Sequence, residues 1–301
     1  MIEMGCTIQG SLQSLQQRPI FFTGSNAEPP LCIPKHAAEI QMTASRKYIP
    51  CGIGDYAMMG VTSPVTIAGV LAQRNAVQMV SLLLSQISQP GAPFYYTATS
   101  GSADMRTLNP VMTDPRVVKV LRTSAQLGSF YHLPIMGIAT TDSKSPDSQA
   151  AVERAICVQV SIDSGVHIIQ GPTSMMDQMM LSCFIQTIID NDLLGYILAT
   201  LQDPTLDEET LALDVIQDVL QNEATGSMKF AMHEHTSHHM RDEIWQPLVF
   251  NYASFAAWQS AGSPTLNDRA VSVAQRILSM HTPIPLEDSI RNEIFRIASV
   301  P

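Results

Sequence analysis

The first two thirds of this 301-residue chain repeat one pattern: a short apolar run, a polar loop with glycine or proline, and a longer segment of helical period. This alternation is typical of consecutive β-α units. Each run is short and apolar enough to form a strand that is buried on both faces, which predicts a parallel sheet. The five predicted strands span residues 19–23, 48–53, 92–97, 133–140 and 166–170.

Three helices of this region are predicted to begin at a capping side chain. Ser63, Asp114 and Ser145 each precede a proline, so a side-chain oxygen would cap the helix and proline would occupy its first position. The helix predicted over residues 64–89 is apolar on several faces. Such a helix is expected to pack between the sheet and a further surface, such as a second subunit.

The pattern changes at about Asp203, beyond which the sequence predicts helices joined by polar turns and no strand. The predicted helices span residues 207–222, 267–280 and 285–299. Two parts are therefore expected: a β/α region over residues 1–202, and a helical C-terminal extension over residues 203–301 that packs on it.

Charge and motif content argue against several classes of function. The chain has 17 Lys and Arg against 27 Asp and Glu, a net charge of −10, and its basic residues are scattered. Nucleic-acid binding needs a concentrated basic face, so it is not expected. Neither G-x-G-x-x-G nor a Walker-type loop is present, so a nucleotide cofactor has no phosphate-binding loop. No uninterrupted apolar run reaches membrane-spanning length, and no membrane partner is expected.

Cysteine usage and the N-terminus predict a cytoplasmic protein. The five cysteines are odd in number and widely spaced, without a C-x-x-C pair, as is typical of buried thiols in a reducing compartment. Residues 1–10 have neither a basic start nor a long apolar core, so no secretory signal is predicted.

Candidate functional residues follow the predicted strands, because the active site of a parallel β/α architecture lies at the carboxyl ends of its strands. Tyrosine faces attract an alkylammonium group by about 0.5–2 kcal/mol, and carboxylates would balance its charge. A bulky organic cation is therefore the expected ligand. Asp142 and Asp177 are explained equally well as helix caps, and strand alternation allows at most one of Tyr95 and Tyr96 to face the interior. The candidates are Tyr95, Tyr96, Asp104, Arg106, Asp142, Lys144 and Asp177.

Four histidines lie close together between residues 233 and 239. His235 and His239 are four residues apart and could share one face of a helix. A zincin motif requires glutamate directly after the first histidine of such a pair, but Thr236 occupies that position. The sequence therefore predicts packing or hydrogen-bonding histidines and no bound metal.

Six sequence blocks are similar, in order and in approximate spacing, to those of one known family. They are MGVTSPVTIAG at residues 59–69, QPGAP at 89–93, DMRT at 104–107, TDSKSPDSQA at 141–150, ETLALDVI at 209–216 and EHT at 234–236. Together they resemble the trimethylamine methyltransferase family, and the resemblance covers nearly the whole chain.

The resemblance implies a (β/α)8 barrel that moves a methyl group from a methylated amine to the Co(I) of a partner corrinoid protein, so the corrinoid (cobalamin) is not bound by this chain directly. Family members with pyrrolysine act on trimethylamine, and others act on glycine betaine or further quaternary amines. Pyrrolysine would lie at or near Lys144, and none is written in the sequence, which therefore resembles the second branch.

Site roles on this interpretation are Asp142 and Lys144 as catalytic residues, with Arg106 available for a substrate carboxylate. The expected substrate-binding residues are Tyr95, Tyr96, Asp104, Arg106, Asp177 and His235. Few catalytic groups are needed, because a quaternary ammonium already has a neutral leaving group and requires only alignment and desolvation. An exposed lysine at a helix start, or a Schiff-base lysine of an aldolase-like barrel, are the alternatives for Lys144.

A closed barrel needs eight strands, whereas the sequence predicts about five. The chain is therefore expected to form a partial barrel that is completed by an N-terminal polypeptide or by oligomerisation. A doubly wound sheet is the alternative fold, and its strand order would reverse at a switch point. A non-catalytic binding or scaffolding subunit is the alternative function.

Overall fold

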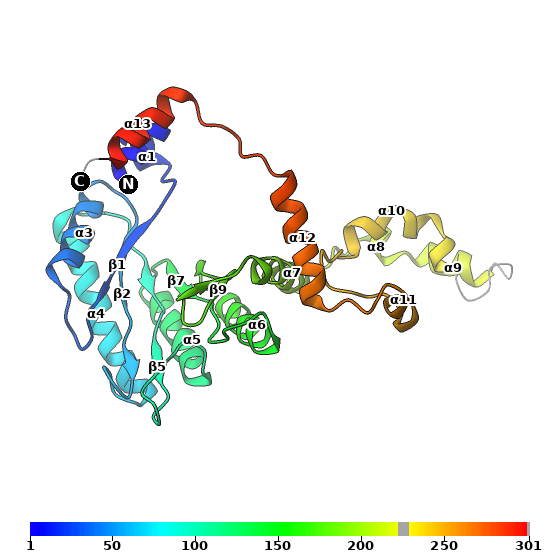
Figure 1. The fold of residues 1–301 in the computed structure, drawn as a ribbon, viewed down its shortest axis with the longest axis horizontal. Coiled ribbons are helices and arrows are strands. Elements are labelled where there is room, and N and C mark those ends of the chain that lie inside the picture. Colours follow the sequence, from blue (N-terminus) through cyan, green and yellow to red (C-terminus); the bar gives the residue numbers. More distant parts are fainter. Residues whose placement is uncertain (222–228, 300–301) are drawn as a thin grey trace.

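The computed structural model describes residues 1–221 and 229–299, which form a mixed α/β structure. Five strands run parallel, and each lies beside its neighbour in the chain without a reversal of order (Figure 1). A parallel bridge between Cys51 and Phe94 joins the second of these strands to the segment leading into the third. The described residues do not form a closed barrel. The strands are β1 (Thr23–Ala27), β2 (Cys51–Asp55), β4 (Tyr96–Thr97), β7 (Ile135–Ile138) and β8 (Ile168–Gln170).

The predicted parallel sheet is confirmed, with strands that begin two to four residues later than expected. The first strand shows why. The apolar run at residues 19–23 leads up to it, whereas β1 itself has the sequence TGSNA. Apolar composition locates a strand that is buried on both faces, but one face of β1 borders an open hollow and carries small and polar residues.

Shorter strands lie in the loops that follow β2, β4 and β8. They form a three-stranded sheet of β3, β5 and β6 and a two-stranded sheet of β9 and β10. Strands of two or three residues are too short for a period of alternation to be visible in the sequence. Their bounds are β3 (Met58–Met59), β5 (Gly101–Ala103), β6 (Pro110–Val111), β9 (Met175–Met176) and β10 (Leu181–Ser182).

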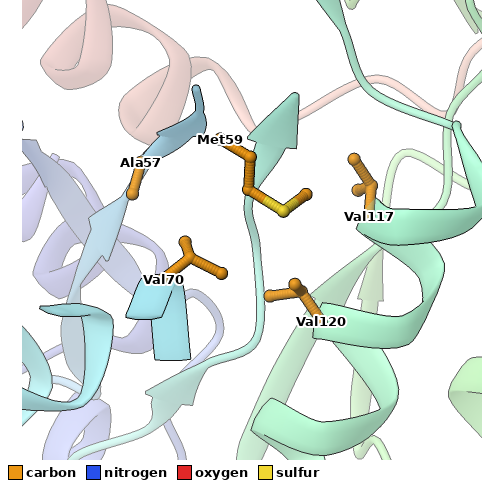
Figure 2. Packing of buried hydrophobic residues seen from close by; sticks show 5 residues of the cluster. All are labelled: Ala57, Met59, Val70, Val117 and Val120. Atoms are coloured by element: carbon orange, nitrogen blue, oxygen red, sulfur yellow. The ribbon is translucent and has the colours of Figure 1, made fainter. Parts of the chain in front are cut away.

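Helices α3 to α7 follow the strands and cover one side of the sheet, and two short helices precede it (Figure 1). One core cluster shows how the layers join: Val70 of α4, Val117 and Val120 of α5, and Met59 of β3 meet in a buried contact (Figure 2). The helices are α1 (Ile2–Gln9), α2 (Leu12–Gln17), α3 (Lys35–Arg46), α4 (Ile67–Ser88), α5 (Pro115–Phe130), α6 (Ser148–Asp163) and α7 (Phe184–Thr200).

The predicted helix caps are confirmed at one position and wrong at two. Asp114 caps α5 by accepting hydrogen bonds from the N–H groups of residues 116 and 117, with Pro115 at the first position. Ser145 is not a cap, because the carboxylate of Asp147 accepts from the backbone N–H of residue 150 and α6 begins two residues later than predicted. Ser63 lies in a bridge beside Met59, and α4 begins only at Ile67.

Helix α4 has, by length and composition alone, the character of a segment that could cross a membrane, with a mean hydropathy of 1.3. This differs from the expectation drawn from uninterrupted apolar runs, because Arg74 and several amide and hydroxyl side chains interrupt the apolar sequence. In the structure α4 packs against α3, α5 and β2, as a helix of the β/α region.

The described residues of the C-terminal extension form helices joined by loops, with no strand among them. The predicted helix over residues 207–222 is broken at Ala212, whose φ of 49° ends α8 and lets α9 begin; residue 222 lies outside the described part. Helix α12 packs on α7, and α13 returns to pack on α1 (Figure 1). The elements are α8 (Glu208–Leu211), α9 (Leu213–Gln221), the 3-10 turn Phe230–Met232, α10 (Glu234–Glu243), α11 (Phe255–Ser260), α12 (Leu266–Met280) and α13 (Asp288–Ala298).

Candidate active site

The inner face of the sheet, on the side away from the helices, lines a hollow of about 350 Å³ toward the carboxyl ends of the strands. Its described lining contains three aromatic side chains and two methionines, and no Asp, Glu, Lys, Arg or His. The lining residues are Phe22, Thr23, Gly24, Ser25, Asn26, Gly52, Gly54, Tyr56, Tyr95, Thr99, Met136, Ile138, Gln170 and Met179.

Glycines in β1 and β2 make room for Tyr95 on this inner face. A Cβ on Gly52 would lie 2.6 Å from the Tyr95 carbonyl oxygen and 2.7 Å from its ring, and one on Gly24 would lie 2.5 Å from its hydroxyl. The Tyr95 hydroxyl donates a 2.8 Å hydrogen bond to the carbonyl of Thr23. Phe22 meets the ring edge to face at 5.6 Å. Tyr95 is therefore held across two strands as part of the wall of the hollow.

Tyr96 points the other way, as strand alternation requires. Its hydroxyl donates to Asn75 of α4 at 3.2 Å, and its ring lies 6.3 Å from that of Tyr131. Burial raises the pKa of Tyr95 and raises that of Tyr96 to about 12, so both phenols stay neutral at physiological pH. Of the two tyrosines, only Tyr95 lines the hollow.

Tyr56 is a lining residue that the sequence analysis missed. Its hydroxyl is buried and has no hydrogen-bond partner among the described residues. Burial and the nearby carboxylate of Asp142 raise its pKa, so the phenol is protonated. Because a buried hydroxyl without a partner is costly, this group is suited to a ligand placed in the hollow. A tyrosine directly after the second strand was the available sequence signal.

Asp142 is occupied by the protein itself. Its carboxylate accepts hydrogen bonds from the backbone N–H groups of Met112 and Thr113 and, at 2.6 Å, from the Thr113 hydroxyl. The side chain is buried between the loops that follow β4 and β7. This geometry gives Asp142 a structural role between two loops. It is not a helix cap, because Asp114 caps α5 and Asp147 caps α6, and it is not among the described residues that line the hollow.

Lys144 and Asp177 form an ion pair of 3.4 Å on the outer loops. The ammonium also donates a 2.6 Å hydrogen bond to the carbonyl of Asp142, and the lysine side chain is 66% exposed. A Schiff-base lysine is activated by desolvation or by a neighbouring cation, and neither is present here. The structure thus favours the alternative of an exposed lysine, although Lys144 lies in the loop before α6 and not at the start of that helix.

The loop after β8 takes an unusual path. Asp177, Gln178 and Met179 have φ values of 47°, 58° and 70°, in the left-handed region that non-glycine residues seldom adopt. The backbone N–H groups of residues 177 and 178 donate to the carbonyls of Ser143 and Thr141, which ties this loop to the one after β7. The turn brings Met179 into the lining of the hollow.

Arg154 of α6 fixes the loop after β8 by hydrogen bonds to backbone carbonyls. Its guanidinium donates to the carbonyls of Ala139 and Gly171, at 3.1 and 2.6 Å, and to that of Met175 at 2.5 Å. Nε lies 3.1 Å from the Asp190 carboxylate, and both side chains are fully buried. This N–H is not aimed at the oxygen, so the contact is an ion pair without a hydrogen bond. Asp190 in turn accepts from the backbone N–H of Ser174.

Asp104 and Arg106 lie on the hairpin between β5 and β6 and pair with each other. The guanidinium donates two hydrogen bonds to the carboxylate, at 3.1 and 2.9 Å, and holds the pKa of Asp104 below its usual value. The Arg106 side chain is 88% exposed. Neither residue lines the hollow.

His235 lies on α10, which Figure 1 places at the far end of the molecule from β1 and β2. Its ring stacks 4.3 Å from that of His239, and His239 lies 3.4 Å from Glu209. Within the described ranges, no three His, Cys, Asp or Glu side chains gather as a metal ion would require. The structure therefore does not bring His235 to the other candidate residues.

Comparisons with known proteins agree on one family. A sequence model of trimethylamine methyltransferase matches residues 1–297. A trimethylamine methyltransferase of Desulfitobacterium hafniense is 30% identical over 96% of this chain and 57% of its own length. A Methanosarcina barkeri trimethylamine methyltransferase is 27% identical over 95% and 56%, and a D. hafniense glycine betaine methyltransferase is 26% identical over 96% and 59%. The chain thus spans a little over half the length of these relatives.

Proposed function

We propose that this chain, which belongs to the trimethylamine methyltransferase family, takes part in moving a methyl group from a quaternary or tertiary methylamine to the Co(I) of a corrinoid protein. The observation that carries the proposal is the hollow on the inner face of the sheet, whose described lining contains Phe22, Tyr56 and Tyr95 and no charged side chain.

Aromatic faces and an uncharged lining suit a methylated ammonium group. Each well-placed ring attracts such a cation by about 0.5–2 kcal/mol, and the attraction is larger where water is excluded. The phenols of Tyr56 and Tyr95 remain neutral because burial raises their pKa, so they present ring faces and hydroxyl dipoles. A phosphorylated substrate would find no basic group here.

The chemistry asks little more of the protein than position and desolvation. A docked corrinoid protein would supply the Co(I) electron pair that takes the methyl carbon. The C–N bond would break and a neutral amine would leave with its electrons, which requires the nitrogen to be quaternary or, in a tertiary amine, protonated. Tyr95, fixed by its bond to Thr23, would hold the ammonium group against the sheet. The free hydroxyl of Tyr56 would orient a polar group of the substrate. Arg154 would keep Met179 against the ligand by fixing the loop after β8.

The (β/α)8 barrel is part of this proposal. Five parallel strands in chain order are what a barrel segment requires, and β1 pairs on one side only within the described residues. The relatives contain additional sequence that this chain does not match. We expect the remaining strands to come from such sequence, on a complementing N-terminal polypeptide, or from a second copy of the chain.

The experiment is methyl transfer from trimethylamine, glycine betaine and tetramethylammonium to Co(I)-corrinoid, followed by the loss of the Co(I) absorption. Tyr95→Leu should lower the affinity for the accepted amine by about 2- to 30-fold, which corresponds to about 0.5–2 kcal/mol. Tyr131→Leu is the matched control, because Tyr131 lies on the helix side of the sheet. Absence of both amine binding and turnover in the completed assembly would refute the proposal and favour a scaffolding subunit.

A further inference from the structure

Helix α4 packs on the sheet with its more polar face and exposes its apolar face. Its inner face is largely polar: Arg74, Gln78, Ser81 and Ser85 are each buried to 1% exposure or less. Arg74 donates to the carbonyl of Thr97 at 2.8 Å, and Gln78 donates to a carbonyl of β2 at 2.7 Å. A helix on the surface of a globular protein normally carries its polar residues on the opposite face.

The outer face of α4 is entirely apolar. Every exposed residue of the helix is an alanine, valine, leucine or isoleucine, and the positions recur at intervals of three or four residues along one side. Leu83 is 57% exposed and Ile87 is 72% exposed. We call this surface the α4 face; it consists of Ala68, Ala72, Ala76, Val80, Leu83 and Ile87. A continuous exposed apolar strip of this kind marks a contact with another surface.

Basic residues flank the α4 face. The exposed side chains of α3 and α5, the two neighbouring helices, include Lys35, Arg46, Lys119 and Arg122 against a single acidic residue, Glu39. Two α4 faces packed together would bring these like charges near each other, which is unfavourable. The complementary partner is therefore an apolar surface with acidic borders.

Such a surface exists at the other end of the molecule (Figure 1). Leu211 and Leu213, which are 53% and 68% exposed, line a hollow of about 540 Å³ together with Glu208, Glu209 and Asp214. We call these five residues the acidic leucine surface. Figure 1 shows α8 and α9 at the opposite end of the molecule from α4, so the two surfaces cannot meet within one chain.

We propose that the α4 face of one copy binds the acidic leucine surface of a second copy, head to tail. The contact is heterologous, so repetition would build a ring or a filament, and each chain would use two different surfaces. Apolar contact supplies affinity, and the basic and acidic borders fix the orientation. The inference rests on these two surfaces and is independent of the proposed catalytic function.

Sedimentation velocity of the full chain over a dilution series tests the proposal. Leu83→Glu and Leu213→Glu each place a charge in the apolar part of one surface, and each should weaken self-association by about tenfold or more. Each variant keeps the other surface intact. An equimolar mixture of the two should therefore form one-to-one complexes that neither variant forms alone, and added salt should weaken them severalfold.

Val152→Glu is the matched control, because Val152 is also 57% exposed and lies on α6, away from both surfaces. It should associate as the unaltered chain does, and circular dichroism should show all three variants folded. Normal association of Leu213→Glu, a mixture that stays monomeric, or a chain that is monomeric at every concentration would each overturn the proposal. Binding of the unaltered chain to phosphatidylserine vesicles, lost in Leu83→Glu without any self-association, would assign the α4 face to a lipid surface instead.

Discussion

Arg154→Met is expected to be one of the most destabilising single substitutions in the β/α region. Arg154 joins three loop carbonyls to the carboxylate of Asp190 on α7, with both side chains fully buried. Methionine fills a similar volume but donates no hydrogen bond. The substitution would leave Asp190 as a buried charge without its cation and would remove one donor from each of three carbonyls, of which that of Met175 keeps the hydroxyl of Thr140.

The magnitude follows from what remains unpaired. Breaking a buried ion pair by removing one partner costs about 3–5 kcal/mol, against a typical total stability of about 5–15 kcal/mol. Replacing both partners with apolar residues removes the stranded charge as well. Arg154→Met combined with Asp190→Leu should therefore be less destabilised than the sum of the two single variants, by about 1–3 kcal/mol.

Urea unfolding of the unaltered chain, the two single variants and the double variant measures this coupling. Amine binding gives a second readout, since the loop that Arg154 holds brings Met179 to the hollow. A loss below about 1 kcal/mol in Arg154→Met, or full additivity in the double variant, would show that the pair does not hold the loop.

Three further outcomes follow from the structure. Gly52→Ala should displace the Tyr95 ring, whose nearest atom would lie 2.7 Å from the new Cβ, and so weaken amine binding measured by calorimetry; unchanged affinity would remove Tyr95 from the site. A thiol reagent at pH 8 should modify exposed Cys32 and leave Cys51 unmodified until unfolding, because burial raises the Cys51 pKa to about 12. Burial also raises the pKa of Asp55, so this carboxyl group stays protonated in the folded state at pH values where it is ionised in the unfolded state. The contribution of Asp55 to the free energy of unfolding is therefore complete below the unfolded-state pKa and is lost as the pH rises through the folded-state pKa. Asp55→Asn should abolish this pH-dependent loss in the free energy of unfolding, measured by urea titration at several pH values. The same pH dependence in both proteins would show that Asp55 does not cause the loss.

The sequence alone identified the order of β and α units, the Asp114 cap and the family. The units and the cap are local features, whereas the family resemblance rests on six blocks spread over residues 59–236. A short apolar run bounded by glycine or proline, or an aspartate before a proline, defines its own structure through backbone geometry and nearby hydrogen bonds. The change to helices near Asp203 could be predicted as well, because helical periodicity is also a local feature of the sequence.

The candidate site could be predicted only in part from the sequence. Alternation along a strand predicted that at most one of Tyr95 and Tyr96 faces inward, but which one depends on how β4 lies between β2 and β7. The role of Asp142 was undecidable from its position after a strand, because its partners at residues 112 and 113 come from the preceding loop. Tyr56 became a candidate only when its hydroxyl was found buried and unpartnered.

Tertiary structure alone decided which polar groups meet. Arg154 reads as an ordinary arginine of an amphipathic helix, yet it binds carbonyls 15 to 21 residues away in the chain. Likewise, the sequence shows that α4 is apolar, but only the packed molecule shows that its polar side faces the sheet. The physical reason is common to both. Periodicity in the sequence indicates that a helix has a polar and an apolar face. Which face is buried depends on whether polar partners, such as the carbonyls of residues 53 and 97 in the sheet, lie within hydrogen-bonding distance.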